Sequence, residues 1–335
     1  MPNSLLDTLD LQLIHALQID PRVSWNTLAG IVPSDPATLA RRWARIEREG
    51  IAWISAVAGE TTNGSGGLAL VEFVCEPGAV LTTAAAAAAD PAIFSIDLTA
   101  GRRDLIATLS APDDAALAEY ALERLGVIPG IRDVRTHVVT EVLRLGSDWT
   151  VQALTPGEQA RVPAPRPPRA GSAKRLDPAF ATRVRHLLAA DGRASYVELG
   201  ERLGVSAQRV SDAIALLRRS GSLVLRTDVA APYTNWPLAA WFFLEAPAAT
   251  AARAAEAVAG MPEVQYASLA TGPYNLIVAA GARAKTELLR IEAELERRLP
   301  GARIADRSVV LRVHKHLGRI LDRSGRATGE IVPLA

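Results

Sequence analysis

The chain aligns with itself at one constant offset, and this repeat constrains the fold more than any other feature. Asp20–Ser24, DPRVS, matches Asp191–Ser195, DGRAS, and the separation of Asp20 from Asp191 defines the repeat offset. The same offset pairs turn-forming residues further along the chain, namely Gly50 with Gly221, Gly101 with Gly272, and Pro129-Gly130 with Pro300-Gly301. The sequence therefore predicts two tandem copies of one module of about 140–150 residues, in place of a single large domain.

Each copy is predicted to begin with three short helices. In copy one, the third helix begins after Asp35, which can accept the unpaired N–H groups of the first turn, and Pro36 suits the first helical position. Gly50 ends this helix, where glycine easily takes a positive φ. In copy two, Ser195 and Ser206 are the corresponding caps of the second and third helices. Three helices with a tight turn before the third are typical of a helix-turn-helix.

The third helix carries the candidate DNA-binding residues. Leu39, Trp43 and Ile46 recur at helical spacing and form an apolar stripe that should face the core. The residues off this stripe are polar or basic, and they are Thr38, Arg41, Arg42, Arg45 and Arg48, with Gln208, Arg209 and Arg219 in copy two. A guanidinium can make paired hydrogen bonds to guanine or phosphate, and the helix N-terminus presents N–H groups to phosphate.

We predict that Thr38, Arg41 and Arg42 contact base edges and that Arg45 and Arg48 contact the backbone or the helix flank. Copy two has Ala213 and Leu216 where copy one has Arg42 and Arg45. We therefore expect copy one to bind DNA more strongly. The alternative for the single helix is a solvated basic face with no partner, since charged helix faces are usually just exposed.

The rest of each copy is predicted to form a β-α-β-β-α-β domain of the ferredoxin-like type. The predicted class is therefore α+β, with two tandem copies of a winged-type helix-turn-helix followed by a ferredoxin-like effector (RAM) domain. The expected ranges are 1–54 and 175–226 for the helix-turn-helix domains and 67–146 and 237–316 for the effector domains. Residues 155–174 include the run VPAPRPPRAGSAK and should form an extended linker.

Composition narrows the classes of function. The net charge of +1 means that nucleic-acid binding must come from a local patch. Cys75 is the only cysteine, which excludes an intrachain disulfide or a cysteine-based zinc site. The start of the chain does not resemble a signal peptide, and no apolar run reaches the length of a membrane span, so we expect a cytoplasmic protein. No nucleophile-base motif or phosphate loop is evident, and we expect no enzyme activity, cofactor or metal. His15 and His186 are predicted to lie on helix surfaces.

The ordered set of motifs resembles the Lrp/AsnC (feast/famine) transcription regulators. Leu6-Asp7-x-x-Asp10 and the segment from Leu17 to Ser24 are similar to the opening of that family. Arg42, Arg45-Ile46-Glu47 and Gly50-Ile51 match its third-helix pattern in part. The resemblance implies binding to double-stranded DNA, response to a small-molecule effector such as an amino acid, and self-association through the effector domains.

The resemblance also implies an effector site at the loop between the two central strands. Its residues here are Gly101, Arg102, Arg103 and Asp104, with Gly272, Tyr274 and Asn275 in copy two. Asp104 could receive the ammonium group of an amino acid, and Arg102 or Arg103 its carboxylate. Asn275 lacks the charge of Asp104, so the second site is expected to be altered or silent. The alternative is that both loops are only hairpin turns.

Two other functions remain open. Sirohaem decarboxylases resemble this fold and also occur as fused chains, but they carry histidine- and arginine-rich haem-binding stretches. Here the segment 95–106 has Arg102 and Arg103 without a histidine, and 266–277 has neither residue type. The other alternative is an architectural protein that binds DNA largely without sequence preference, against which the nearly neutral charge argues.

Overall fold

The computed structural model describes residues 6–59, 66–164 and 176–334, which form two compact units. The helical unit contains the described residues up to 59 and those from 150 to 230. The sheet unit contains residues 66–149 and 231–334. Each unit combines segments from the first half of the chain, before residue 165, with segments from the second half, after residue 175.

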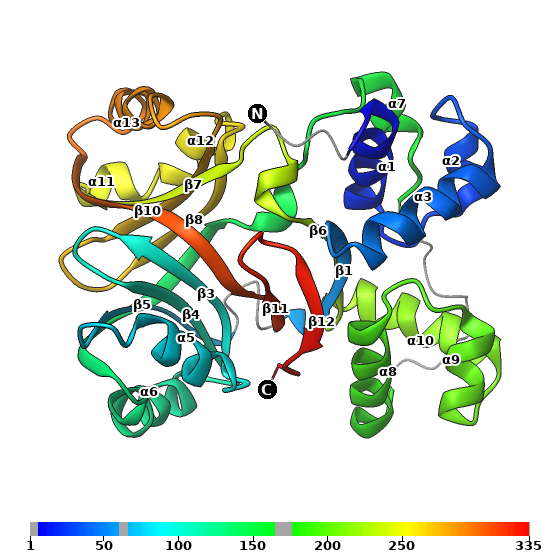
Figure 1. Ribbon diagram of the computed structural model, residues 1–335, viewed down its shortest axis with the longest axis horizontal. Helices are drawn as coiled ribbons and strands as arrows, with labels where there is room; N and C mark the ends of the chain where they lie inside the picture. Colours follow the sequence, from blue (N-terminus) through cyan, green and yellow to red (C-terminus); the bar gives the residue numbers. More distant parts are fainter. Residues whose placement is uncertain (1–5, 60–65, 165–175, 335) are drawn as a thin grey trace. The chain divides into compact units, whose positions relative to one another are not determined.

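The helical unit holds two groups of three helices, which flank a pair of strands (Figure 1). Its elements are α1 (Thr8–Ile19), α2 (Trp25–Ala29), α3 (Pro36–Arg48), β1 (Ala52–Val57), α7 (Pro156–Arg161), α8 (Pro178–Ala190), α9 (Tyr196–Leu203), α10 (Ala207–Arg219) and β6 (Val224–Val229). The predicted third helices are thus α3 and α10. None of the helices in the described part of the chain combines the length and apolarity that crossing a bilayer requires.

The start and stop signals of α3 and α10 are confirmed. The Asp35 carboxylate accepts a hydrogen bond from the N–H of Thr38 at 2.9 Å, and Ser206 caps α10 in the same way. Gly50 follows α3 with a φ of +65°, a conformation that costs little only for glycine. Trp43 is buried on the apolar side of α3, as its spacing predicts.

Strands β1 and β6 pair with each other in antiparallel orientation, so neither belongs to a wing hairpin of its own. The ladder is centred on Ser55 and Arg226, which the repeat offset makes equivalent. An antiparallel ladder centred on equivalent residues relates the two groups of helices by an approximate two-fold axis. The prediction of a winged type was wrong because a lone strand must satisfy its backbone hydrogen bonds with a neighbour, and here that neighbour is its counterpart.

A reciprocal pair of arginines reinforces this two-fold arrangement. Arg22 donates to the carbonyl oxygens of Gly192 and Ala194 at 2.7 and 2.9 Å. Arg193 is its equivalent and donates to the carbonyl oxygens of Pro21 and Val23 at 2.6 and 2.8 Å. Each guanidinium also lies over an aromatic ring of the opposite half, with Arg193 3.8 Å from the centre of Trp25.

The predicted linker is not extended throughout. Thr155 and Glu158 form a reciprocal capping box, which starts the short helix α7 at Pro156. Val162 is then buried within the helical unit, with an exposed fraction of 6%. The capping signal therefore outweighs the proline content at the beginning of this segment, and residues 165–175 lie outside the described part of the chain.

The sheet unit contains two β-α-β-β-α-β segments. The first consists of β2 (Gly67–Cys75), α5 (Val80–Ala88), β3 (Ile93–Ala100), β4 (Leu105–Ala111), α6 (Asp114–Glu123) and β5 (Ile131–Arg144). The second consists of β7 (Leu238–Glu245), α11 (Ala248–Ala251), α12 (Ala254–Ala259), β8 (Val264–Ala270), β9 (Leu276–Ala282), α13 (Glu287–Arg298) and β10 (Arg303–His316). Short 3₁₀ turns lie at Leu125–Val127, Gly146–Asp148 and Ala231–Tyr233.

The two four-stranded sheets join into one closed sheet. Within the first segment the strand order is β3-β4-β2-β5, and within the second it is β8-β9-β7-β10. Strand β5 pairs with β8, and β10 pairs with β3, which leaves neither sheet with an open edge. The pair Val139–Ala270 in one junction corresponds, by the repeat offset, to Val310–Thr99 in the other.

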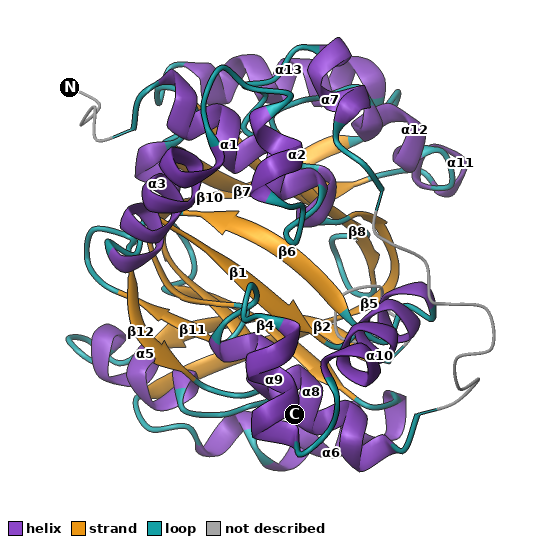
Figure 2. Ribbon diagram, turned by 90° about the vertical axis from the view of Figure 1, so that its right-hand side faces the viewer, coloured by secondary structure: helices purple, strands orange, loops and turns teal. Residues whose placement is uncertain are grey.

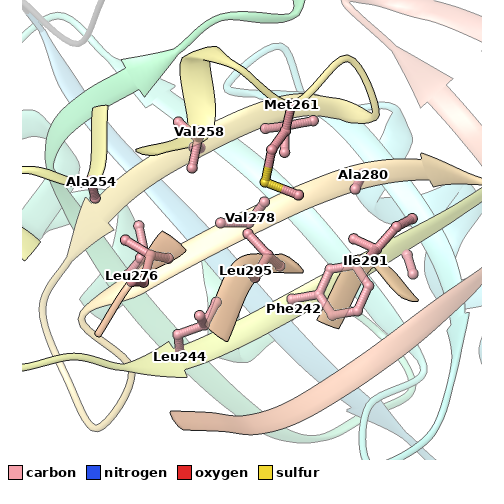
Figure 3. Close-up of a cluster of buried hydrophobic side chains, with 14 of the residues drawn as sticks. Phe242, Leu244, Ala254, Val258, Met261, Leu276, Val278, Ala280, Ile291 and Leu295 are labelled. Atoms are coloured by element: carbon pink, nitrogen blue, oxygen red, sulfur yellow. The ribbon is translucent and has the colours of Figure 1, made fainter. Parts of the chain in front are cut away.

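Helices cover the outer face of the closed sheet on two sides (Figure 2). The core of the second segment lies between its sheet and α12 and α13, with Phe242, Val258 and Leu295 among its buried side chains (Figure 3). An equivalent core packs α5 and α6 on the first sheet. A smaller apolar cluster on the inner faces of the sheets includes Leu70, Trp241 and Phe243.

Two regions of the sheet unit differ from the sequence prediction. The first helix of the second β-α-β-β-α-β segment, which the sequence predicts as one element, is broken at Ala252 and Arg253 into α11 and α12. The last residues form two further strands, β11 (Arg319–Leu321) and β12 (Ala327–Ile331), which extend the sheet beyond β10. The turn between β10 and β11 has Leu317 and Gly318 at positive φ, which suits a tight hairpin.

Candidate functional sites

The outward side of α3 presents two arginines to solvent. Arg41 and Arg48 are exposed, and the exposed Ala37 and Ala44 lie on the same stripe of the helix. Thr38 is half-buried in the first turn, where its N–H is held by the capping aspartate. Within residues 36–44 of this helix, Arg41 is therefore the one exposed charged side chain.

The outward side of α10 carries different side chains. Arg209 and Arg219 are exposed, and the guanidinium of Arg209 lies 5.4 Å from the ring centre of Phe180. Gln208 and Asp212 are half-buried and joined by a hydrogen bond of 2.9 Å from the amide nitrogen to the carboxylate. Arg218 is turned toward Asp20 of the first half, to which it donates at 2.9 Å.

Arg42 and Arg45 form ion pairs within the helical unit. Arg42 lies 2.7 Å from a carboxylate oxygen of Asp7 and 2.9 Å from one of Asp10. Arg45 lies 2.6 Å from the second oxygen of Asp10, whose side chain is 2% exposed. The two arginines thus compensate a buried charge on α1 and fix α3 against it. Their predicted contacts with DNA stay a prediction, but both have a structural role.

In the second half, three members of this charged cluster are all replaced by apolar residues. The equivalents of Asp10, Arg42 and Arg45 are Ala181, Ala213 and Leu216, all of which are buried. Where no buried carboxylate needs compensation, apolar side chains fill the space between the helices. The absence of two arginines from α10 therefore has a packing explanation, and by itself it does not indicate weaker DNA binding by the second half.

Both predicted effector loops are tight turns, and the last polar side chain of each binds backbone atoms. Gly101 and Gly272 have φ values of +124° and +107°. The Asp104 carboxylate accepts from the N–H of Cys75 at 2.8 Å, and the Asn275 amide makes two hydrogen bonds of 2.8 Å to the backbone of Ala246. The two residues thus perform the same task of holding the end of a preceding strand. The missing charge at Asn275 does not set the two loops apart.

Arg103 points into the sheet unit, whereas Arg102 is exposed. The Arg103 guanidinium is 1% exposed and donates to Glu72 at 2.7 Å, to Asp306 at 2.9 Å and to Ser308 at 2.8 Å. It also lies 4.0 Å from the ring centre of Phe243. This single side chain therefore connects the inner faces of both sheets.

A histidine and an aromatic pair complete this inner cluster. Nε2 of His137 is 2.7 Å from a carboxylate oxygen of Glu72. Burial would raise the pKa of Glu72, but the hydrogen bond from His137 and the nearby Arg103 guanidinium hold it below its usual range. The half-buried Tyr274 ring lies 5.4 Å from Phe243 and 5.9 Å from His137. The structure thus brings Arg103 and Tyr274, from the two predicted loops, to one cluster.

Several inner polar residues were missed by the sequence analysis. Besides Glu72, His137, Asp306 and Ser308, they include Asp97, whose carboxylate accepts from Nε1 of Trp241 at 2.8 Å. Burial raises the pKa of Asp97 to about 6. The signal for Glu72 was available, since it is the one charged residue in the apolar strand 67–75. No local pattern marks the others, because their partners lie on other strands, which for Asp97, Asp306 and Ser308 belong to the opposite half.

Comparison with known proteins identifies both domain types in the first half. Residues 6–47 match the AsnC-type helix-turn-helix domain, and residues 68–147 match the Lrp/AsnC ligand binding domain. An uncharacterized HTH-type transcriptional regulator of Pyrococcus abyssi is 26% identical over 144 residues, which are 42% of this chain and 90% of that protein. A similarly described regulator of Pyrococcus furiosus is 26% identical over 143 residues, 42% of this chain and 97% of its own.

A solved structure is similar to both halves together. The crystal structure of the siroheme decarboxylase NirDL covers 92% of this chain and 93% of its own, with a TM-score of 0.57 and 16% identity. At this identity the likeness concerns the fold alone. The first half of the chain thus carries an AsnC-type helix-turn-helix domain followed by an Lrp/AsnC ligand binding domain.

Proposed function

We propose that the protein is a sequence-specific DNA-binding regulator in which one chain supplies both members of the pair of DNA-binding domains. The observation that carries this proposal is the two-fold arrangement of α3 and α10 about the β1–β6 ladder. Exposed arginines on the outward sides of the two helices support contact with a duplex. From the predicted DNA-binding residues we keep those that face outward, which are Arg41, Arg48, Arg209 and Arg219.

The sheet unit supports pairing within one chain through two equivalent cations. Lys315 donates to the carbonyl oxygens of Ala88 and Asp90, at the end of α5 in the first half. Arg144 occupies the equivalent position and donates to Val258 and Met261, at the end of α12 in the second half. Each half therefore caps a helix of the other, and cations at helix C-termini are favourable.

Charge also favours pairing between unlike halves. The residue equivalent to Asp306 in the first half is Arg135. Two first halves paired in the same geometry would place Arg135 near the buried Arg103, where like charges repel strongly. We propose on this basis that the first half pairs with the second half and not with another first half.

The DNA-binding proposal is tested by fluorescence anisotropy with fragments selected from genomic DNA. We expect specific binding that falls with salt, because phosphate contacts release counterions. The double variant Arg41→Ala/Arg48→Ala should lose affinity, while Arg132→Ala, which removes an exposed arginine of the sheet unit, is the matched control and should not. Equal losses in the two variants, or no binding by the native protein, would contradict the proposal.

For the effector, we propose a small molecule of the amino-acid type that acts at the loops 101–104 and 272–275. The exposed Arg102 and the half-buried Tyr274 support a ligand with a carboxylate and an apolar group. A panel of amino acids is tested for a shift in melting temperature and in DNA affinity, with Arg102→Ala as the variant. An effector whose binding is unchanged in that variant would contradict this placement.

The decarboxylase alternative has one structural point in its favour, which is the likeness to NirDL over both halves. Against it, the residues that the sequence offers for a haem carboxylate include Arg103, which is engaged in the inner ion pairs. Adding sirohaem and recording the absorption spectrum separates the two proposals. A Soret band that shifts on binding would favour the alternative, and an unchanged spectrum would favour the regulator.

A further inference from the structure

We infer that the two third helices bind different bases and that Arg41 and Asp212 set the difference, so that the preferred operator has two unlike half-sites. This inference rests on the proposed DNA-binding function and specifies the DNA that the same surface selects. Arg42 and Arg45 do not enter this inference, because their equivalents Ala213 and Leu216 are buried against α8 for reasons of packing.

The two residues occupy one position in a common frame. The repeat offset makes Arg41 and Asp212 equivalent, and each is the sixth residue of its helix. The first turns of a recognition helix contact base edges when the helix lies in the major groove. Because the β1–β6 ladder relates α3 and α10 by an approximate two-fold axis, both positions approach the duplex in the same way.

The side chains at this position have opposite hydrogen-bonding character. A guanidinium only donates, and its two parallel N–H groups match the O6 and N7 acceptors of guanine. A carboxylate only accepts, and the base edge that offers a donor without an adjacent acceptor is the N4 amino group of cytosine. We therefore assign a guanine to the half-site under α3 and a cytosine to the equivalent position under α10.

The surroundings of Asp212 fit this assignment. The Gln208 amide nitrogen donates to Asp212 at 2.9 Å, which restrains the carboxylate at its position on α10. The flanking Arg209 and Arg219 are exposed, so the helix keeps positive charge for the phosphates despite one acidic residue. On α3 the equivalent of Gln208 is Ala37, which leaves space beside Arg41 for a base pair.

The test begins with selection of duplexes from a random library by the full-length protein. From the selected site, two symmetric duplexes are made, one with guanine and one with cytosine at the assigned position in both half-sites. We expect the native protein to bind the unlike site about tenfold more tightly than either symmetric duplex, since one well-placed base contact discriminates by roughly that factor. Asp212→Arg should shift the preference to the guanine duplex, and Arg41→Asp should shift it to the cytosine duplex.

Arg48→Ala is the matched control, because it removes an exposed arginine beyond the first turns of α3. It should lower affinity for all three duplexes by the same factor. Unfolding curves of each variant confirm that the helical unit is intact. A palindromic selected site, or an unchanged preference in Asp212→Arg, overturns this inference and leaves the proposed function in place. Failure of the native protein to bind any duplex overturns both.

Discussion

Acidification should detach the segment that follows the first effector domain from α1, because a buried histidine holds it. His15 is 1% exposed, although its sequence context predicted a surface position. Its Nδ1 accepts hydrogen bonds from the N–H groups of Ala153 and Leu154, at 3.0 and 2.8 Å. Only the neutral imidazole with an unprotonated Nδ1 can accept these two bonds. Burial lowers the pKa of His15 to about 4, against a small opposing effect of the Glu158 charge.

The size and direction of the effect follow from the two pKa values. The unfolded value is 6.5, so between pH 6.5 and 4 the unfolded chain binds a proton at His15 that the folded chain does not. The contribution to stability is therefore complete above about pH 6.5 and is lost as the pH falls toward 4. The difference between the pKa values corresponds to about 3 kcal/mol.

The assay is urea unfolding of the native protein and His15→Gln between pH 7.5 and 4, combined with amide hydrogen exchange at residues 153 and 154. The native protein should lose about 3 kcal/mol more than the variant over this range, since only the native protein carries the titrating group. His186→Gln is the matched control, because His186 is equivalent in sequence but exposed on α8. Parallel curves for the native protein and His15→Gln would refute the reasoning.

Three further predictions concern charged side chains that are buried or half-buried in the fold. Asp10→Ala should lower the free energy of unfolding, measured in urea, by about 3–5 kcal/mol. Adding Arg42→Ala and Arg45→Leu, which gives the residues found in the second half, should restore much of this free energy. A triple variant that is no more stable than Asp10→Ala would contradict this prediction. Lys315→Met should lower stability by about 1–3 kcal/mol, while Lys315→Arg should approach the native melting temperature, because Arg serves at the equivalent position; equal losses would count against the cap. Asp306→Arg should destabilise the sheet unit more than Asp306→Asn, as judged by urea midpoints, since it places like charge beside a buried guanidinium.

Local chemistry determined much of this fold from the sequence alone. Capping residues such as Asp35, Ser206 and Asp113 act within one turn of the helix that they begin, so their partners are fixed by spacing. The order of strands and helices in each effector domain follows from apolar periodicity for the same reason. The apolar stripe of Leu39, Trp43 and Ile46 predicted buried side chains, and all three are buried.

The candidate sites depended on distant partners, which only the tertiary structure decided. The sequence predicted that the Asp104 carboxylate binds the effector, but in the structure it accepts a hydrogen bond from the N–H of Cys75 at the end of β2. Arg42 and Arg45 read as DNA contacts, but α1 places Asp10 between them. A charged side chain pairs with whichever opposite charge folding brings within a few ångströms, and that distance is set by packing between helices and sheets rather than by separation along the chain.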